Sequence, residues 1–293
     1  MTFATFLIQC LNGLQYGLLL FLVASGLTLL FGIMGVINLA HGAFYMAGAY
    51  LAYALTPWVR ETLGADFLVA VVIGVALSIA FGALLEWVFF SFLYERDHLQ
   101  QVLMTYGLIL VFEQVRSLLL GDQVHGVAAP QWLSGSVSLG GVMNYPVYRL
   151  FMTCISAAVV GALFWVIHRT RFGMAVRASS SDRPTAQAMG IPIRRLYRVV
   201  FAAGFALAVL AGMIAAPVST VYPGMGDGVL ILSLVVTVIG GIGSIGGTLL
   251  ASLLVAMADT FGKVLVPQAS GIAVYLLMTA VLVWKPEGLF RQV

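Results

Sequence analysis

The chain has 293 residues, of which 61% are hydrophobic and only 9% are charged, and its formal net charge is +3. A soluble domain carries roughly 25% charged residues, so this composition excludes a protein of this size with a mostly water-facing surface. Lipid must therefore be the solvent for most of the surface.

Apolar segments long enough for membrane helices recur along the whole chain. A helix that crosses a ~30 Å hydrocarbon core needs about 20 mostly apolar residues. Such segments lie at 10–33, 37–57, 67–93, 101–120, 147–168, 198–217, 228–243, 247–264 and 270–285. We expect an all-α, polytopic transmembrane bundle with eight or nine spans, because 228–243 is short and interrupted by glycine. A β-barrel is disfavoured, because it needs alternating segments of about ten residues, whereas stretches such as Val69–Ala83 are apolar on every side.

The first two expected spans are joined by a short polar interruption. Asn38, His41 and Gly42 break an otherwise apolar sequence at the expected inner end of these spans. Polar groups at membrane depth are costly unless they have partners, and buried polar groups are usually hydrogen-bonded. We expect Asn38 and His41 either to bond backbone groups where two helices break and turn, or to line or gate a pathway.

Several ionisable side chains lie within or beside the expected spans. Glu86 has no partner nearby in the sequence, so we expect an interhelical or snorkelled position rather than a substrate site. Glu113 and Arg116 are three residues apart, and Asp259 and Lys263 are four apart with the acid first, so both pairs are expected to neutralise each other on a helix. The segment 121–146 is rich in Gly, Ser and Pro, and it reads as an external loop too short to be a domain.

Half of the fourteen basic residues lie between two spans. The segment 169–198 holds seven arginines and one acid, Asp182, a net charge of +6, so the rest of the chain has −3. Basic loops stay on the cytoplasmic side, and 169–198 is therefore expected inside. Counting the spans backwards places the N-terminus outside, which suits a chain whose first basic residue is Arg60 and in which we expect no cleavable signal peptide. Lys285 and Arg291 mildly favour nine spans, because they then lie inside as well.

The basic segment contains the signals of one short helix over 182–191. Asp182 or Ser181 is a good N-cap, Pro184 suits the first turn, and Gly190 followed by Pro192 ends the helix. A helix of about two turns is too short to be stable alone, so it must rest on another part of the protein. By itself this pattern fits a solvated connector as well as it fits a docking element for a cytoplasmic partner.

Two glycine-rich runs follow in the last third of the chain. The run 240–247 holds five glycines and Ser244 in eight residues, which is more than helix packing needs. We expect a bend between two half-membrane helices there, as in transporters with interrupted helices. The run 224–228 is expected to be a turn outside the membrane, and it is not a phosphate-binding loop because no Lys-Ser or Lys-Thr follows it.

Several of these motifs resemble one known family. The run 25–42, which ends Asn38-Leu-Ala-His41-Gly42, together with 46–50, resembles the branched-chain amino acid permeases of ABC importers, in their shorter, LivH-like subunit. The run 240–247 and the segment ending Trp284-Lys-Pro-Glu-Gly288 extend the likeness to nearly the whole chain. In the basic segment, Ala186-x-x-x-Gly190-Ile191 looks like the loop through which such permeases contact their ATPases.

The resemblance implies a single permease domain over 1–293, with a cytoplasmic coupling loop at 169–198. Coupling to the ATPases would involve Asp182, Arg183, Thr185, Ala186, Gly190 and Ile191. The translocation path or its hinges would involve Asn38, His41, Gly42, Gly240, Gly241, Gly243, Ser244 and Gly247. The implied partners are a second, LivM-like permease, two cytoplasmic ATPases and a periplasmic binding protein, in a bacterial inner membrane, with no nucleic acid.

Three function classes could use a polytopic helical membrane protein. A permease of an ABC importer has no nucleotide site of its own, and no Gly-x-x-x-x-Gly-Lys-[Ser/Thr] occurs in the sequence; ATP would be used by partner subunits, and no cofactor is expected in this chain. The alternative is an ion-coupled secondary transporter of a small neutral solute, but that class usually places carboxylates at mid-membrane. A membrane enzyme is disfavoured, because no catalytic triad or metal-ligand cluster is visible: Cys10 and Cys154, for instance, lie in apolar runs.

The first class is favoured, and the sparse intramembrane charge suits a neutral or zwitterionic, largely apolar solute. Branched-chain or other hydrophobic amino acids are the substrates that the resemblance implies.

Overall fold

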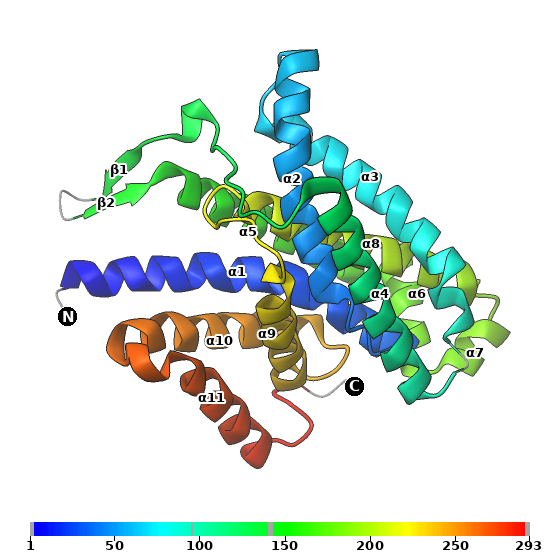
Figure 1. The fold of residues 1–293 in the computed structure, drawn as a ribbon. Helices are drawn as coiled ribbons and strands as arrows, with labels where there is room; N and C mark the ends of the chain where they lie inside the picture. Colours follow the sequence, from blue (N-terminus) through cyan, green and yellow to red (C-terminus); the bar gives the residue numbers. More distant parts are fainter. Residues whose placement is uncertain (1–2, 95, 140–142, 291–293) are drawn as a thin grey trace.

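The protein is a bundle of helices with one small β-hairpin (Figure 1). The structure, a computed structural model, describes residues 3–94, 96–139 and 143–290. In chain order its elements are α1 (Phe3–Met34), α2 (His41–Leu63), α3 (Phe67–Val88), η1 (Phe90–Phe92), α4 (His98–Leu120), η2 (Gln131–Leu133), β1 (Ser136–Leu139), β2 (Met143–Pro146), α5 (Val147–Arg169), α6 (Arg171–Ser181), α7 (Arg183–Ala188), α8 (Ile193–Ala215), α9 (Met225–Gly240), α10 (Ile245–Leu265), η3 (Pro267–Ala269) and α11 (Ser270–Trp284).

The predicted apolar segments all fall on helices, which confirms a helical, polytopic membrane protein. Within the described residues, six stretches are long and apolar enough to cross a membrane on their own: α1, Phe67–Phe92, α4, α5, α8 and α10. The helices α9 and α11 are apolar but shorter, and α2 is not among the six. The count of eight or nine full crossings therefore stays a prediction.

Two local elements differ from what the sequence suggested. The external loop contains an antiparallel hairpin, in which Ser136 of β1 pairs with Pro146 of β2. The basic segment contains a second helix, α6, ahead of the expected short one. The hairpin was missed because its four-residue strands are too short to show a pattern. Helix α6 is amphipathic, with Gly173, Val176 and Ser179 buried on one face, and this periodicity was overlooked beside the stronger cap signals of 182–191.

The helix ends gather at two opposite faces of the bundle. At the face that holds the basic segment, the Tyr197 hydroxyl donates to the carbonyl of Ile33, the last but one residue of α1. At the other face, the Tyr148 hydroxyl at the start of α5 donates to the carbonyl of Ile214 at the end of α8. The N-terminus lies at the face opposite the basic segment, so it would lie outside if the basic segment is inside. The amide of Leu289 bonds the carbonyl of Ile239, which places the end of the described chain on the same side as the basic segment. Arg291, which was expected on that side as well, is not among the described residues.

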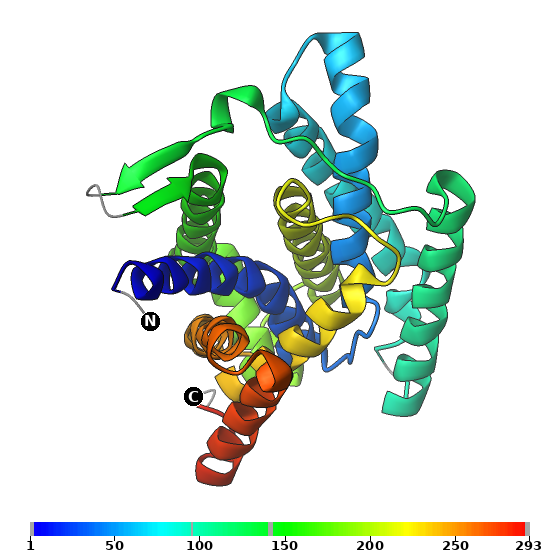
Figure 2. The same cartoon turned by 60° about the vertical axis from the view of Figure 1, so that its left-hand side comes forward.

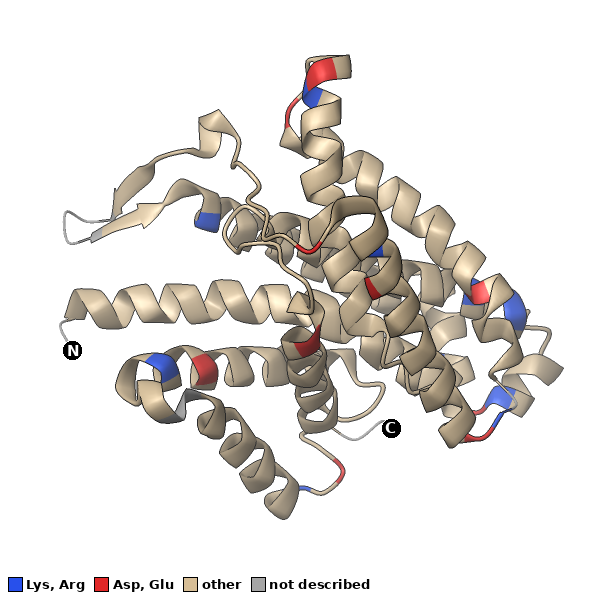
Figure 3. Ribbon diagram, viewed as in Figure 1, with Lys and Arg blue, Asp and Glu red and all other residues tan. Residues whose placement is uncertain are grey.

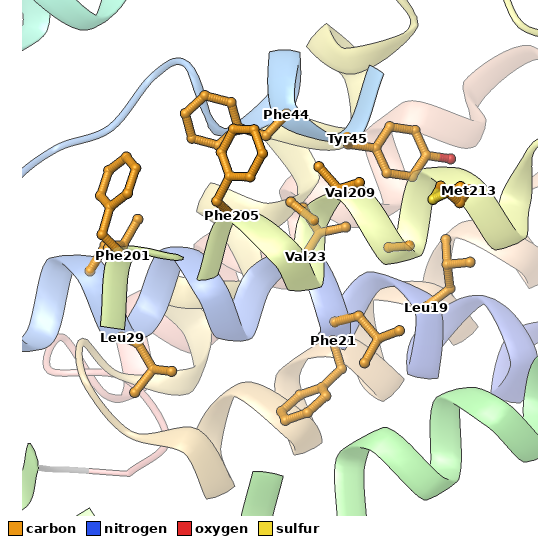
Figure 4. Packing of buried hydrophobic residues seen from close by; sticks show 14 of the residues in the cluster. Leu19, Phe21, Val23, Leu29, Phe44, Tyr45, Phe201, Phe205, Val209 and Met213 are labelled. Carbon is orange, nitrogen blue, oxygen red and sulfur yellow. The ribbon is translucent and has the colours of Figure 1, made fainter. Parts of the chain in front are cut away.

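Helix α1 forms the centre of the core because it is apolar on all sides. Residues 18–30 of this helix are all buried, and a helix of this kind is stable only when neighbours or lipid surround it. Against its middle, Phe44 of α2 and Phe205 of α8 pack with ring centroids 4.5 Å apart (Figure 4). Beside them Phe201 extends the aromatic cluster toward the inner face.

The two ends of the chain build two similar four-helix units of opposite orientation. Helices α1, α2, α3 and α4 of the first unit correspond to α8, α9, α10 and α11 of the second, because their contacts match. Between the units, α1 packs on α10 as α8 packs on α3, and α2 packs on α8 as α9 packs on α1. Within the units, α2 contacts α3 and α4 as α9 contacts α10 and α11. The units α1–α4 and α8–α11 are thus related as inverted repeats, a common plan of transporters. The two units meet where α2 contacts α9; in Figure 2, α2 (blue) rises from the middle of the molecule to its upper edge, and α9 (yellow) lies below it.

Glycines permit the close approach along the boundary between the units. A Cβ atom on Gly26 would lie 2.7 Å from the Gly204 carbonyl oxygen, where α1 crosses α8. A Cβ atom on Gly42 would lie 2.4 Å from the Gly226 carbonyl oxygen, where α2 and α9 begin. Backbones can come this close only when neither residue has a side chain.

Candidate functional site

The short helix predicted in the basic segment is present as α7. Asp182 is its N-cap: its carboxylate accepts from the Thr185 amide at 3.1 Å and from the Thr185 hydroxyl at 2.5 Å. These hydrogen bonds lower the pKa of Asp182. Gly190 ends the turn with a φ of +86°, and the amide of Ile191 bonds the Ala186 carbonyl. Of the two expected caps, Asp182 is therefore the one used, while Ser181 ends α6.

One face of α7 rests on the protein and the other is open. Ala186 is buried, and the guanidinium of Arg183 lies 5.2 Å from the ring of Tyr197 on α8. Thr185 and Met189 point outward, and Met189 is 80% exposed. The helix is thus held by α6 and α8 and offers a free outer surface.

Helix α6 fixes α7 to the membrane bundle. Its cap is Thr170, whose hydroxyl accepts from the Gly173 amide at 3.1 Å. Arg177 donates to the Ile167 carbonyl at the end of α5, and the Ser180 hydroxyl donates to the Gly32 carbonyl near the end of α1 at 3.0 Å. These two hydrogen bonds connect α6, on which α7 rests, to the inner ends of α5 and α1.

A second connection runs from α8 to α3. The carboxylate of Glu86 is buried, with 2% of its side chain exposed, and it accepts from Arg198 at 3.0 Å and from the Tyr94 hydroxyl at 2.6 Å. Burial and the bond to Glu86 raise the pKa of Tyr94. Tyr94 in turn packs on Tyr197, with ring centroids 4.9 Å apart. Glu86 has the interhelical position expected for it.

The link between α1 and α2 lies inside the bundle. The Asn38 side-chain oxygen accepts from the Ala40 amide at 3.0 Å, and Nε2 of His41 lies 2.9 Å from the Val23 carbonyl. Both side chains are at most 1% exposed. Both side chains therefore bond backbone groups where α1 ends and α2 begins, which was one of the two roles expected for them. Their other nitrogen atoms, Asn38 Nδ2 and His41 Nδ1, have no partner within the described residues. Gly42 is the next residue and contacts Gly226.

The glycine run 240–247 bends the chain between α9 and α10, as expected, but only α9 is short: α10 has 21 residues and is long enough to cross a membrane. Gly241 and Gly243 have φ angles of +94° and +81°, and the Ser244 hydroxyl caps α10 by accepting from the Gly247 amide at 3.1 Å. The run also provides a close contact, because a Cβ on Gly247 would lie 1.9 Å from the Gly240 carbonyl oxygen. Both uses of glycine weighed from the sequence thus occur together.

A cavity of 480 Å³ lies between the basic segment and this bend. Ser180 and Arg177 of α6 line one side, and Ser244 and Gly246 line the other. Thr28 of α1 lies at the same cavity, and its hydroxyl is 3.1 Å from that of Thr237 and 3.0 Å from that of Thr248. The cavity thus brings helix α6 close to Gly243 and Ser244 of the predicted hinge group, whereas none of the six predicted coupling residues lines it, and neither do Asn38 and His41. The threonine cluster was missed, because three threonines on three distant helices give no sequence signal.

Local ion pairs confirm one expectation and correct another. Lys263 lies 2.5 Å from Asp259, as predicted. Arg116 pairs with Asp122 at 2.9 Å instead of Glu113, because α4 ends at Leu120 and the chain turns back onto the arginine. Hydrogen bonds from Arg116 and Ser117 lower the pKa of Asp122.

The other glycine run, 224–228, is a turn but does not lie outside. Gly224 has a φ of +76° and is the N-cap residue of α9, as a turn requires. Gly226 nevertheless contacts Gly42, and the neighbouring His41 is bonded to Val23, in the second half of α1. Helix α9 therefore begins at mid-depth of the bundle, and the expected external position was wrong.

Comparisons with known proteins agree on one family. The sequence matches the family model described as "Branched-chain amino acid transport system / permease component" over residues 9–283. It is 30% identical to the high-affinity branched-chain amino acid transport system permease protein BraD of Pseudomonas aeruginosa, over 98% of this chain and 96% of that protein. It is 28% identical to the corresponding protein LivH of Escherichia coli strain K12, over 99% and 97% of the two chains. A solved structure, PsaBC from Streptococcus pneumoniae in complex with Fab, gives a TM-score of 0.46 at 14% identity, over 93% of this chain and 89% of that one.

Proposed function

Because the chain belongs to the branched-chain amino acid transport system permease family, and so is a membrane permease subunit of an ABC importer, we propose that it moves branched-chain or other neutral, largely apolar amino acids across a bacterial inner membrane. The names of its relatives give the substrate class. The scarcity of charge within the bundle supports it, since a strongly anionic solute would need fixed cations along its path (Figure 3).

The observation that carries the coupling mechanism is helix α7. It is a capped helix of six residues with one face on α6 and α8 and one face open. A helix this short keeps its shape only while it is held from one side, so its free face is suited to contact with a second protein. We assign that contact to a cytoplasmic ATPase, made through the outer side of Thr185 and Met189 and the turn at Gly190.

Two routes carry a displacement of α7 into the membrane. The first runs from Arg183 through Tyr197, whose hydroxyl bonds the Ile33 carbonyl at 3.0 Å and so reaches α1. The second runs from the start of α8 through Arg198 to Glu86 on α3. Because α1 and α3 belong to one repeat and α8 to the other, a push on α7 changes the relation between the two repeats.

The remaining parts of the importer follow from this assignment. Two ATPases bind and hydrolyse ATP, a second, LivM-like permease completes the membrane core, and a periplasmic binding protein delivers the amino acid. This chain would act as one permease domain without a nucleotide site or cofactor. The bends at 35–40 and 241–244 are where the helices would reorient between inward-open and outward-open states, with Asn38 and Ser244 at those bends.

Transport by the reconstituted complex tests the proposal. The purified permeases and ATPases in vesicles, supplied with the binding protein and leucine, should take up leucine only when ATP is present on the ATPase side. Uptake that needs no ATPase and stops when an ion gradient is collapsed would refute the proposal.

The side of the membrane on which α7 lies can be tested separately. Met189→Cys places a thiol on the exposed face of α7, in a background with Cys10 and Cys154 replaced by serine. A membrane-impermeant maleimide should label it only from the cytoplasmic side. Labelling from the periplasm would invert the topology and remove the coupling role.

A further inference from the structure

Asp227 is an acidic residue in an unusual place for a membrane protein. It lies in the first turn of α9, and its side chain is exposed on the surface of the bundle.

The contacts of its neighbours place Asp227 at membrane depth. Gly226 touches Gly42, and His41 beside it is bonded to the carbonyl of Val23. Val23 is twenty residues from the start of α1 and eleven from its end, which is roughly 30 Å and 16 Å at 1.5 Å per residue. Asp227 therefore lies well inside a hydrocarbon layer of ~30 Å.

No cation in the described part of the chain pairs with this carboxylate. Within the described residues the ion pairs are Arg116–Asp122, Arg198–Glu86 and Lys263–Asp259. Asp227 does contribute to the start of α9, where an acid in the first turn stabilises the helix dipole. That effect is smaller than the cost of exposing a carboxylate to hydrocarbon, so lipid is not what covers this surface.

The place where the starts of α2 and α9 meet, here called the junction, holds other polar groups without partners among the described residues. Asn38 Nδ2 and His41 Nδ1 are buried and unbonded among the described residues, and both belong to the link that leads to Gly42. The junction is also where the two inverted repeats meet and where both interrupted helices begin. In transporters with this plan, solute sites lie at mid-membrane between the repeats.

We propose that Asp227 faces the water-filled translocation path and binds the α-ammonium group of the transported amino acid. This rests on the proposed function, in which the solute is a zwitterion. A carboxylate is complementary to an ammonium group through charge-assisted hydrogen bonds. The carboxylate thus retains an amine-bearing solute and does not retain an apolar solute of the same shape.

Thiol accessibility tests the position of the residue without reliance on uptake. Asp227→Cys is compared with Ala158→Cys, which is exposed at the middle of α5, both with Cys10 and Cys154 replaced by serine and both in the assembled importer. A water-soluble, cationic methanethiosulfonate should modify position 227 at least tenfold faster than position 158, and leucine with the binding protein should slow the reaction. Equal rates at the two positions would overturn the proposal even if the wild-type importer is ATP-driven.

Charge substitutions test the contact with substrate. Asp227→Asn should lower leucine uptake per ATP hydrolysed at least tenfold, while Asp227→Glu should restore most of it. A role limited to the start of α9 would instead lower the unfolding temperature of Asp227→Asn without changing the uptake ratio, and that outcome overturns the proposal. If the wild-type complex itself shows no ATP-driven uptake, that result counts against the proposed function. The thiol-labelling rates at positions 227 and 158 then still decide whether Asp227 faces water.

Discussion

Two adjacent glycines at the start of α10 should respond in opposite ways to the same substitution. Gly247 is buried, and a Cβ there would lie 1.9 Å from the Gly240 carbonyl oxygen. Gly246 is half-buried, and a Cβ there meets no atom within 4 Å. Both residues are helical, so the two alanine variants differ in packing and share the same local conformation.

The expected magnitudes follow from these distances. Alanine at 246 restricts the unfolded chain and suits a helix, which stabilises by about 0.4–1 kcal/mol. Alanine at 247 brings the same stabilisation of the helix but forces the backbones of α9 and α10 apart, and overpacking of this kind destabilises by about 1–3 kcal/mol. The free energies of unfolding of Gly246→Ala and Gly247→Ala should therefore differ by about 1–3 kcal/mol.

Thermal unfolding of the purified permease in detergent measures the difference. At roughly 2–4 °C per kcal/mol for a chain of this size, Gly247→Ala should unfold at least a few degrees below Gly246→Ala. Gly240→Ala, whose Cβ would lie 2.7 Å from the Gly247 carbonyl carbon, should behave like Gly247→Ala. If Gly247→Ala is as stable as Gly246→Ala, the close contact between α9 and α10 does not exist as described.

Three further results are expected. Arg198→Ala leaves the buried carboxylate of Glu86 without its cation and should destabilise the permease by about 1–3 kcal/mol, less than for a fully buried pair because the arginine is half exposed. Adding Glu86→Gln should recover part of the lost thermal stability. If the double variant recovers none of it, the two residues are not coupled. Asp182→Ala removes the α7 cap and should reduce ATP-driven uptake, while Asp182→Asn should retain the uptake. Because folding lowers the pKa of Asp182, the charged cap stabilises α7 fully above the unfolded pKa near 3.8, and this stabilisation is lost as the pH falls through the lower folded pKa. Fluorescence of a probe on Met189→Cys should therefore report loosening of α7 only in strong acid. Gly190→Pro cannot adopt the φ of +86° and should insert normally but uncouple ATP hydrolysis from uptake, whereas Gly190→Asn, which tolerates this conformation, should stay coupled; coupled uptake by the proline variant would contradict the role of the turn.

The sequence by itself determined the helical, membrane-spanning class and the positions of the apolar helices. Length and hydropathy are local properties, and lipid makes them decisive, because a chain in hydrocarbon must satisfy its own backbone groups. The cap at Asp182 and the turn at Gly190 were equally readable, since both depend on residues within a single turn of helix. The side of the membrane on which 169–198 lies stays a prediction, drawn from its seven arginines.

Interhelical contacts could not be read from the sequence, because they join residues far apart in the chain. Glu86 finds Arg198 across 112 positions, and Thr28 meets Thr237 and Thr248 across more than 200. Arg116 chose Asp122 over the predicted Glu113 because of where α4 ends. For Glu86 and Thr28 the partner was decided by helix packing, and for Arg116 by the point at which its own helix ends; sequence spacing encodes neither.

Depth within the membrane was also decided by the tertiary structure alone. The run 224–228 has the composition of an external turn, yet Gly226 lies against Gly42 in the interior because the two repeats are inverted and their interrupted helices meet there. A turn can be placed at that depth only where two glycines let the backbones touch. The position of Asp227 on that turn therefore became visible only once the helices were packed together.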